Sequence, residues 1–82
     1  MTVIFTEHAK RQLSERKLSK TFALASVRNP SLTKKQADGR FQFIKSFKQR
    51  GKTFLLVCIV EKSANVLTVV TVFKTSKIKK YL

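Results

Sequence analysis

The chain has 82 residues and a formal net charge of +14, because 18 Lys and Arg residues face only 4 Asp and Glu residues. That length makes one small domain, and 43% hydrophobic residues suffice for a core, which excludes a disordered basic tail. The longest apolar run, Phe54 to Val60, is too short to cross a bilayer. One cysteine excludes an intrachain disulfide framework, and no secretory signal is visible, so we expect a cytoplasmic protein.

The positive charge is spread along the whole chain, with nine basic residues up to Arg40 and nine after it. Such a spread over a folded surface is typical of proteins that follow the phosphates of a nucleic acid. Membrane binding would instead favour a long amphipathic helix, which the pattern does not contain. We therefore expect nucleic acid, or an acidic protein, as the partner and no membrane. A charge excess without a specific partner is the alternative.

The first 30 residues predict a short strand and two helices. Thr2 to Phe5 is β-prone, and Thr6 is a typical N-cap for a helix that runs to about Arg16. Ser19 caps a second helix, which Asn29-Pro30 ends, because proline disfavours a helical residue before it.

The remaining residues predict strands. Ser31 to Lys35 reads as an edge strand with protecting lysines, and Arg40 to Lys48 alternates apolar and polar residues. Phe54 to Val60 is apolar on both faces, as a central strand is, and Val66 to Phe73 is rich in β-branched residues and predicts another. Glu61 to Asn65 between them reads as a polar loop.

This order of elements predicts a single α+β domain over residues 1–82. Two N-terminal helices are expected to pack on one face of a twisted antiparallel sheet of three to four strands. The opposite face of the sheet and its rim are expected to carry the basic groups. Residues 75–82 form either a basic tail or a short helix.

Short motifs in a fixed order run from about Phe5 to Lys77. They are Phe5-Thr6-x-His8-Ala9-x-x-x-Leu13-x-x-Arg16, Leu18-Ser19, Asn29-Pro30 and Val69-Val70-Thr71-Val72-Phe73-Lys74. Together they resemble an uncharacterised bacterial family of the DUF4258 type, which looks like a branch of the RelE/ParE toxin superfamily. One departure lies at Lys10-Arg11-Gln12, where many members carry an Arg three or four residues after the His-Ala pair.

The resemblance implies membership of a toxin–antitoxin module, or a relative of one. RelE-type members cleave messenger RNA without metal, typically on the ribosome, whereas ParE-type members inhibit DNA gyrase. An antitoxin that covers the basic surface, expected to be acidic, neutralises both types. The resemblance also implies catalytic basic side chains on the sheet and a basic residue and a Tyr after the last strand. The matching positions are Lys45, Lys74 and Tyr81.

Metal chemistry does not fit the composition. A two-metal nuclease needs several converging carboxylates, and the four acidic residues have no close spacing. One Cys and one His cannot complete a four-ligand zinc site, so we expect no metal and no cofactor. Cys58 alternates with apolar neighbours and reads as an inert buried thiol.

Metal-free RNA cleavage needs a base for the 2′-hydroxyl, cations for the charged phosphorane and an acid for the leaving oxygen. Histidine suits proton transfer near neutral pH, and His8 is the single histidine, although it could instead only orient its helix. The candidate catalytic residues are therefore His8, Lys45, Lys74 and Tyr81. The candidate nucleic-acid-binding residues are basic and outside the predicted core: Arg11, Arg16, Lys48, Arg50, Lys52, Lys77, Lys79 and Lys80.

Lys45 shares a predicted strand face with Phe41, Phe43 and Phe47. Either this face belongs to the core and the lysine stem reaches out of it, or the rings form a platform on which bases stack. We expect at least two of the rings in the core. The function predicted from these residues is a RelE-like endoribonuclease or translation inhibitor with RNA or the ribosome as its target. The alternatives are a non-catalytic nucleic-acid-binding module and a ParE-like inhibitor of DNA gyrase.

Overall fold

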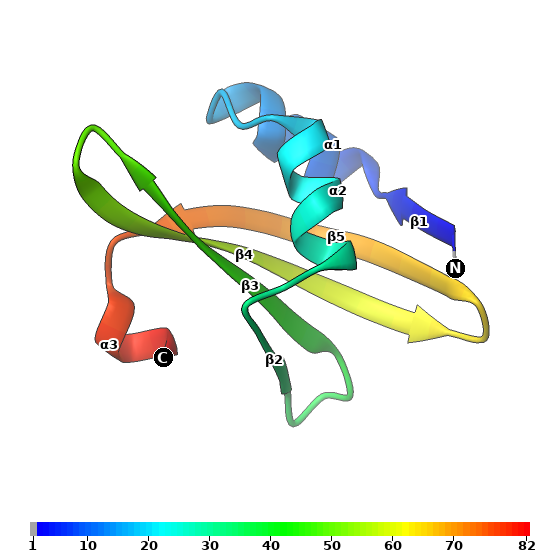
Figure 1. Ribbon diagram of the computed structural model, residues 1–82. Helices are drawn as coiled ribbons and strands as arrows, with labels where there is room; N and C mark the ends of the chain where they lie inside the picture. Colours follow the sequence, from blue (N-terminus) through cyan, green and yellow to red (C-terminus); the bar gives the residue numbers. More distant parts are fainter. Residues whose placement is uncertain (1) are drawn as a thin grey trace.

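The computed structural model describes residues 2–82, which form one five-stranded sheet and three helices (Figure 1). In chain order the elements are β1 (Thr2–Phe5), α1 (Glu7–Glu15), α2 (Lys20–Arg28), β2 (Leu32–Lys35), β3 (Phe41–Gln49), β4 (Lys52–Ser63), β5 (Val66–Thr75) and α3 (Ile78–Tyr81). The strand order in the sheet is β1-β5-β4-β3-β2. Strands β2 to β5 are antiparallel neighbours, and β1 runs parallel to β5.

The α+β class with two N-terminal helices is confirmed, but the sheet differs from the prediction of three to four antiparallel strands. It has five strands and is mixed, because β1 joins its edge with Thr2 opposite Val66 and Phe5 opposite Val69. A parallel partner requires a crossover connection, which α1 and α2 supply together with the strands that follow. The residues Glu61 to Ser63 are also strand rather than loop, since Glu61 pairs with Thr68 on β5.

Local side-chain caps explain where the two N-terminal helices begin. The hydroxyl of Thr6 accepts a hydrogen bond of 3.1 Å from the backbone N–H of Ala9. The hydroxyl of Ser19 accepts one of the same length from the N–H of Phe22. Each cap satisfies a donor that has no partner within its helix, so both helix starts are set by the nearby sequence.

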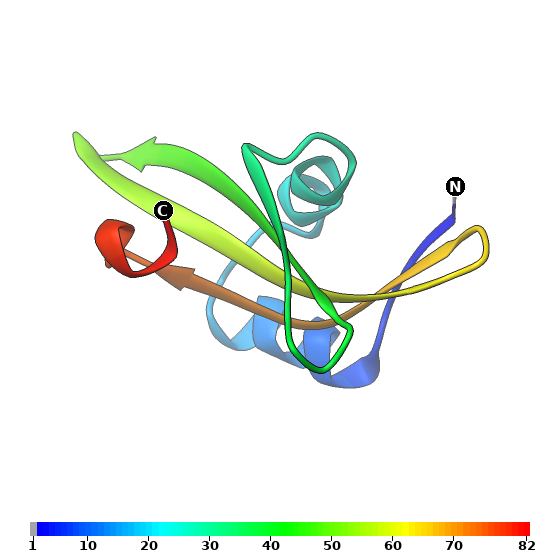
Figure 2. The same ribbon diagram turned by 90° about the horizontal axis from the view of Figure 1, so that it is seen from below.

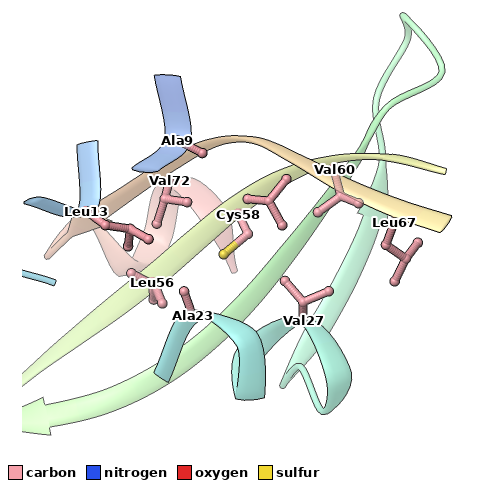
Figure 3. Packing of buried hydrophobic residues seen from close by; sticks show 10 residues of the cluster. Ala9, Leu13, Ala23, Val27, Leu56, Cys58, Val60, Leu67 and Val72 are labelled. Carbon is pink, nitrogen blue, oxygen red and sulfur yellow. The ribbon is translucent and has the colours of Figure 1, made fainter. Parts of the chain in front are cut away.

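The main core lies between the sheet and the two N-terminal helices. Figure 3 shows Ala9 and Leu13 of α1 and Ala23 and Val27 of α2 directed at side chains of the central strands. The buried strand residues of this cluster are Leu56, Cys58, Val60, Leu67, Val69 and Val72. Phe43 and Phe47 pack against the same cluster, which agrees with the expectation that at least two of the three rings belong to the core.

The opposite face of the sheet is apolar at its centre, and the prediction that it carries the basic groups is wrong there. Ile44, Leu55 and Val57 are fully buried on this face. The short helix α3 covers them with Ile78 and Tyr81, so it lies across the sheet from α1 and α2 (Figures 1 and 2). A central strand that is apolar on both sides needs cover on both sides, and here the helices supply that cover on each face.

Candidate functional site

A basic pocket lies where the end of α1, the end of β5 and α3 meet. It is an open hollow of about 440 Å³. Its lining includes four cations, Arg16, Lys74, Lys77 and Lys80, and no carboxylate. Tyr81 lines the same hollow from α3, and Gln12 lines it from α1.

Gln12 holds α1 against the edge of β5. Strand β1 ends at Phe5, so the next part of β5 has no strand beside it on this edge. The side-chain oxygen of Gln12 accepts a 2.8 Å hydrogen bond from the backbone N–H of Val72. The hydroxyl of Thr6 donates a longer bond, 3.4 Å, to the carbonyl oxygen of Val70. Side chains of Thr6 and α1 therefore bond to the edge of β5 that β1 leaves unpaired. This contact places the C-terminal end of α1 beside the pocket.

The end of α1 positions Arg16. Lys17 adopts a left-handed conformation with φ of +54°, and the N–H of Leu18 donates to the carbonyl of Leu13 at 2.8 Å. The N–H of Lys17 donates to the carbonyl of Ser14 at 3.2 Å. These two bonds form a Schellman motif, which ends the helix with Arg16 as its C-cap residue. Arg16 therefore stands at a fixed position one turn beyond Gln12.

Lys74 connects the pocket to the β3–β4 hairpin. Its ammonium group donates a 3.2 Å hydrogen bond to the side-chain oxygen of Gln49. The same group lies 4.7 Å from the centroid of the Phe54 ring. Because Lys74 also lines the basic pocket, the pocket and the hairpin form one continuous basic surface.

The hairpin turn presents a cation at its tip. Arg50 and Gly51 both have positive φ, +54° and +78°, as a tight two-residue turn requires. Asn, Asp or Gly is the usual first residue of such a turn. The positive φ of Arg50 is therefore a strained backbone conformation. Lys48 and Lys52 flank the turn and are exposed. The hairpin thus adds three cations and no acid to the basic surface.

Two of the four candidate catalytic residues, Lys74 and Tyr81, meet in the basic pocket. Lys45 lies in the same row of the sheet as Lys74, with Leu56 between them, two strand spacings or about 10 Å away. His8 is exposed and is not among the lining residues, although it precedes Gln12 by one helical turn on the same side of α1.

The candidate binding residues fall into three groups. Arg16, Lys77 and Lys80 line the pocket, and the three hairpin cations form the second group. Arg11 and Lys79 are exposed and lie outside the lining. Sequence reasoning missed Gln12, whose role follows only from the edge that β1 leaves open.

Tyr81 packs against the sheet and also lines the basic pocket. Its ring packs at 5.9 Å from the ring of Phe73, within the cluster on the α3 side of the sheet. The ammonium group of Lys80 lies 5.6 Å from its centroid. The residue therefore anchors α3 and at the same time contributes to the pocket wall.

The single cysteine, Cys58, is not part of the basic surface and is not suited to act as a nucleophile. Cys58 is fully buried, and burial raises the pKa of its thiol to about 12, so that the thiol stays protonated. Within residues 2–82, no three His, Cys, Asp or Glu side chains gather as a metal site would require. In the same part of the chain no helix has the length and apolar character needed to span a membrane.

The fold and the pocket define a small basic α+β domain with a hollow lined by four cations at one end of its sheet. The family model described as a domain of unknown function, DUF4258, matches residues 5–74, and the chain belongs to this family. No curated protein and no solved structure matches the chain. The matched segment ends at Lys74, so it includes one strand cation of the pocket and leaves α3 outside.

Proposed function

We propose that this DUF4258 protein binds single-stranded RNA at the basic pocket and acts on it as a RelE-like toxin. The activity would be metal-independent cleavage of messenger RNA or inhibition of translation. The observation that carries the proposal is the gathering of four cations, without a carboxylate, around one hollow. In residues 2–82 the ion pairs are Lys10 with Glu7 and Arg40 with Glu61, so the pocket cations remain free for phosphates.

A single strand fits this surface better than a duplex. Proteins read the grooves of a duplex with a protruding helix or ribbon, whereas single strands are held in basic grooves with aromatic side chains. The basic surface here is a hollow beside a sheet edge, and it continues along a hairpin that contains Phe54. The order of a strand, two helices and antiparallel strands also agrees with the RelE-like resemblance.

The pocket contains groups suited to metal-free phosphate chemistry. Arg16 and Lys74 are positioned to stabilise the charge that develops on the phosphorane. Tyr81 carries a hydroxyl that can transfer a proton, and His8 is exposed one helical turn before Gln12 on the same side of α1. In this proposal the cations stabilise the transition state, while Tyr81 and His8 are the candidates for proton transfer.

Binding without cleavage is the second candidate. This candidate is favoured because His8 is not among the residues that line the pocket. Apart from the cations, Tyr81 is then the pocket side chain that is suited to proton transfer. In either case the free cations suit an acidic protein, such as an antitoxin, as a competing partner. An RNA target agrees with a cytoplasmic location.

The binding proposal is tested by titrating a short unstructured RNA at several salt concentrations. Lys74→Gln/Lys77→Gln removes two pocket cations, and Lys35→Gln/Lys62→Gln removes the same charge far from the pocket. We expect the first pair to weaken binding and to reduce the slope of log affinity against log salt by about 1.4, since each single-strand phosphate contact contributes about 0.7. Equal effects of the two pairs would show that only net charge matters.

The toxin proposal is tested by induced expression in bacteria, with growth and new messenger RNA ends as the readouts. We expect growth arrest with the wild-type chain and recovery with Lys74→Gln/Lys77→Gln. Tyr81→Phe and His8→Ala separate cleavage from binding, because each removes a proton-transferring group and leaves the charge of the pocket cations intact. Normal growth at high expression would remove the toxin proposal, and arrest through loss of supercoiling would favour gyrase as the target.

A further inference from the structure

We infer that the β3–β4 hairpin holds one unpaired nucleobase against the ring of Phe54, beside the phosphate-binding pocket. This inference rests on the proposed RNA binding and adds a base-stacking site to it. Phe54 is only partly buried, whereas a phenylalanine that contributed only to the core would be fully buried.

Phe54 is the outer member of a row of three rings. Its ring is stacked on that of Phe47, with centroids 5.9 Å apart and an interplanar angle of 28°. Phe47 in turn meets Phe22 of α2 edge to face at 5.2 Å. The contact with Phe47 orients the Phe54 ring before any ligand binds, so binding would not require the ring to become ordered.

No β5 residue pairs with Phe54. Pairing of β4 with β5 ends at Leu55 and Thr75, so Phe54 has a cross-strand neighbour only on β3. A hollow of about 340 Å³ lies beside the ring, and its other lining residues are Gln49, Arg50 and Lys52. This space is polar at its rim and has one aromatic wall, which is the arrangement that single-strand binders use for a base.

Two ammonium groups occupy the neighbourhood of this ring. Those of Lys74 and Lys52 lie 4.7 Å and 5.6 Å from its centroid. Cation–π contacts of exposed lysines are weak, whereas stacking of a base on an aromatic ring is stronger. A base would therefore displace the two ammonium groups, which would then be free to bind the adjacent phosphates.

Lys74 joins the base site to the phosphate site. Its ammonium group bonds to Gln49 beside the hollow, and its side chain also lines the basic pocket. A ligand that uses both places must present a phosphate and an unstacked base from the same strand. The surface thus favours single-stranded nucleic acid over duplexes and over polyanions that have no bases.

The test compares a short unstructured RNA with inorganic polyphosphate, which offers the charge without bases. Phe54→Leu keeps an apolar side chain and removes the aromatic face, and we expect it to weaken RNA binding by about fivefold or more with polyphosphate binding little changed. Phe41→Leu is the matched control, because Phe41 also has a lysine over its ring, Lys35 at 6.0 Å, and an aromatic neighbour. Equal weakening by the two variants, or equal loss of RNA and polyphosphate, would overturn the inference.

A second variant keeps the test independent of any loss of stability. The chain contains no Trp, so Phe54→Trp introduces a single tryptophan at the proposed site, which can be excited selectively over Tyr81. We expect RNA to quench its fluorescence and polyphosphate to leave it nearly unchanged. Tight RNA binding without quenching would overturn the base site alone, whereas failure of the wild-type chain to bind RNA would overturn the proposed function as well.

Discussion

The two ends of the sheet hold hollows of similar size that differ in charge. At the mixed end, formed by the β2–β3 loop and the last part of β4, a hollow of about 490 Å³ is lined by two acids, Asp38 and Glu61, and two bases, Arg40 and Lys62. At the basic end, the pocket of about 440 Å³ is lined by four bases and no acid. Since volume does not distinguish the two hollows, charge is the property that favours the basic end in the proposed binding of RNA.

The acids of the mixed end are already engaged. Arg40 donates from Nε and Nη2 to one carboxylate oxygen of Glu61, at 2.9 Å and 2.7 Å. Asp38 accepts a 3.0 Å bond from the backbone N–H of Arg40. Two of the four acidic residues thus lie at the mixed end, away from the basic pocket, and one of them, Glu61, pairs with a cation there. In a chain with this net charge, the positions of the few acidic residues decide which part of the surface is most positive.

The largest effect is expected at Gln12, which ties α1 to the basic end. Gln12→Ala leaves the N–H of Val72 without its acceptor, and we expect a loss of about 1–3 kcal/mol in the free energy of unfolding. RNA affinity should also fall, because Arg16 loses its support beside β5. Chemical denaturation and RNA titration measure the two effects.

Gln12→Glu separates these two consequences. A carboxylate can still accept the bond from Val72, but it places a negative charge in the pocket. Stability should stay closer to that of the wild type than in Gln12→Ala, while RNA affinity falls further. Unchanged RNA affinity in Gln12→Glu would break the electrostatic comparison between the two ends.

A smaller effect is expected at the strained hairpin tip. Arg50→Asn gives the turn its favoured Asn-Gly sequence and should stabilise the fold by up to about 1 kcal/mol. The same change should weaken RNA binding, because it removes a cation of the basic surface. Lys17→Gly is the control, since it also relieves a positive φ and removes one charge, but at a residue outside the pocket lining. Thermal melts and RNA titrations should show stabilisation in both variants and weaker binding only in Arg50→Asn.

The smallest effect is expected from altering the mixed end. Asp38→Asn/Glu61→Gln removes both carboxylates there and leaves two cations beside a hollow. The stability loss should be below about 1 kcal/mol, because the Arg40–Glu61 pair is roughly half exposed. RNA affinity should rise slightly as a second, weaker site forms. A fall in affinity would show that the mixed end already contributes to binding.

The sequence alone was sufficient for features that depend on neighbouring residues. The caps at Thr6 and Ser19 and the central strands agree with the structure because their signals are local. The parallel pairing of β1 with β5 could not be read in this way, because it joins segments from opposite ends of the chain. A β-prone segment does not indicate its partner.

The candidate site was predictable in part for the same reason. Lys74 and Tyr81 were proposed from their resemblance to a motif, and the structure places both in one pocket. Gln12 was missed because its importance depends on where β1 ends. Phe54 was assigned to a central strand, and its exposed face depends on where the pairing with β5 ends. Both residues act at open edges, which a periodic pattern does not reveal.

The most direct test of the basic end as the RNA site is an NMR titration of the labelled wild-type chain with a short unstructured RNA. Backbone amide shifts are expected at Arg16, along residues 48–54 and along residues 71–81, with little change at Asp38 to Arg40 and at Glu61 and Lys62. Shifts centred on those mixed-end residues, or spread evenly over all exposed lysines, would contradict the account.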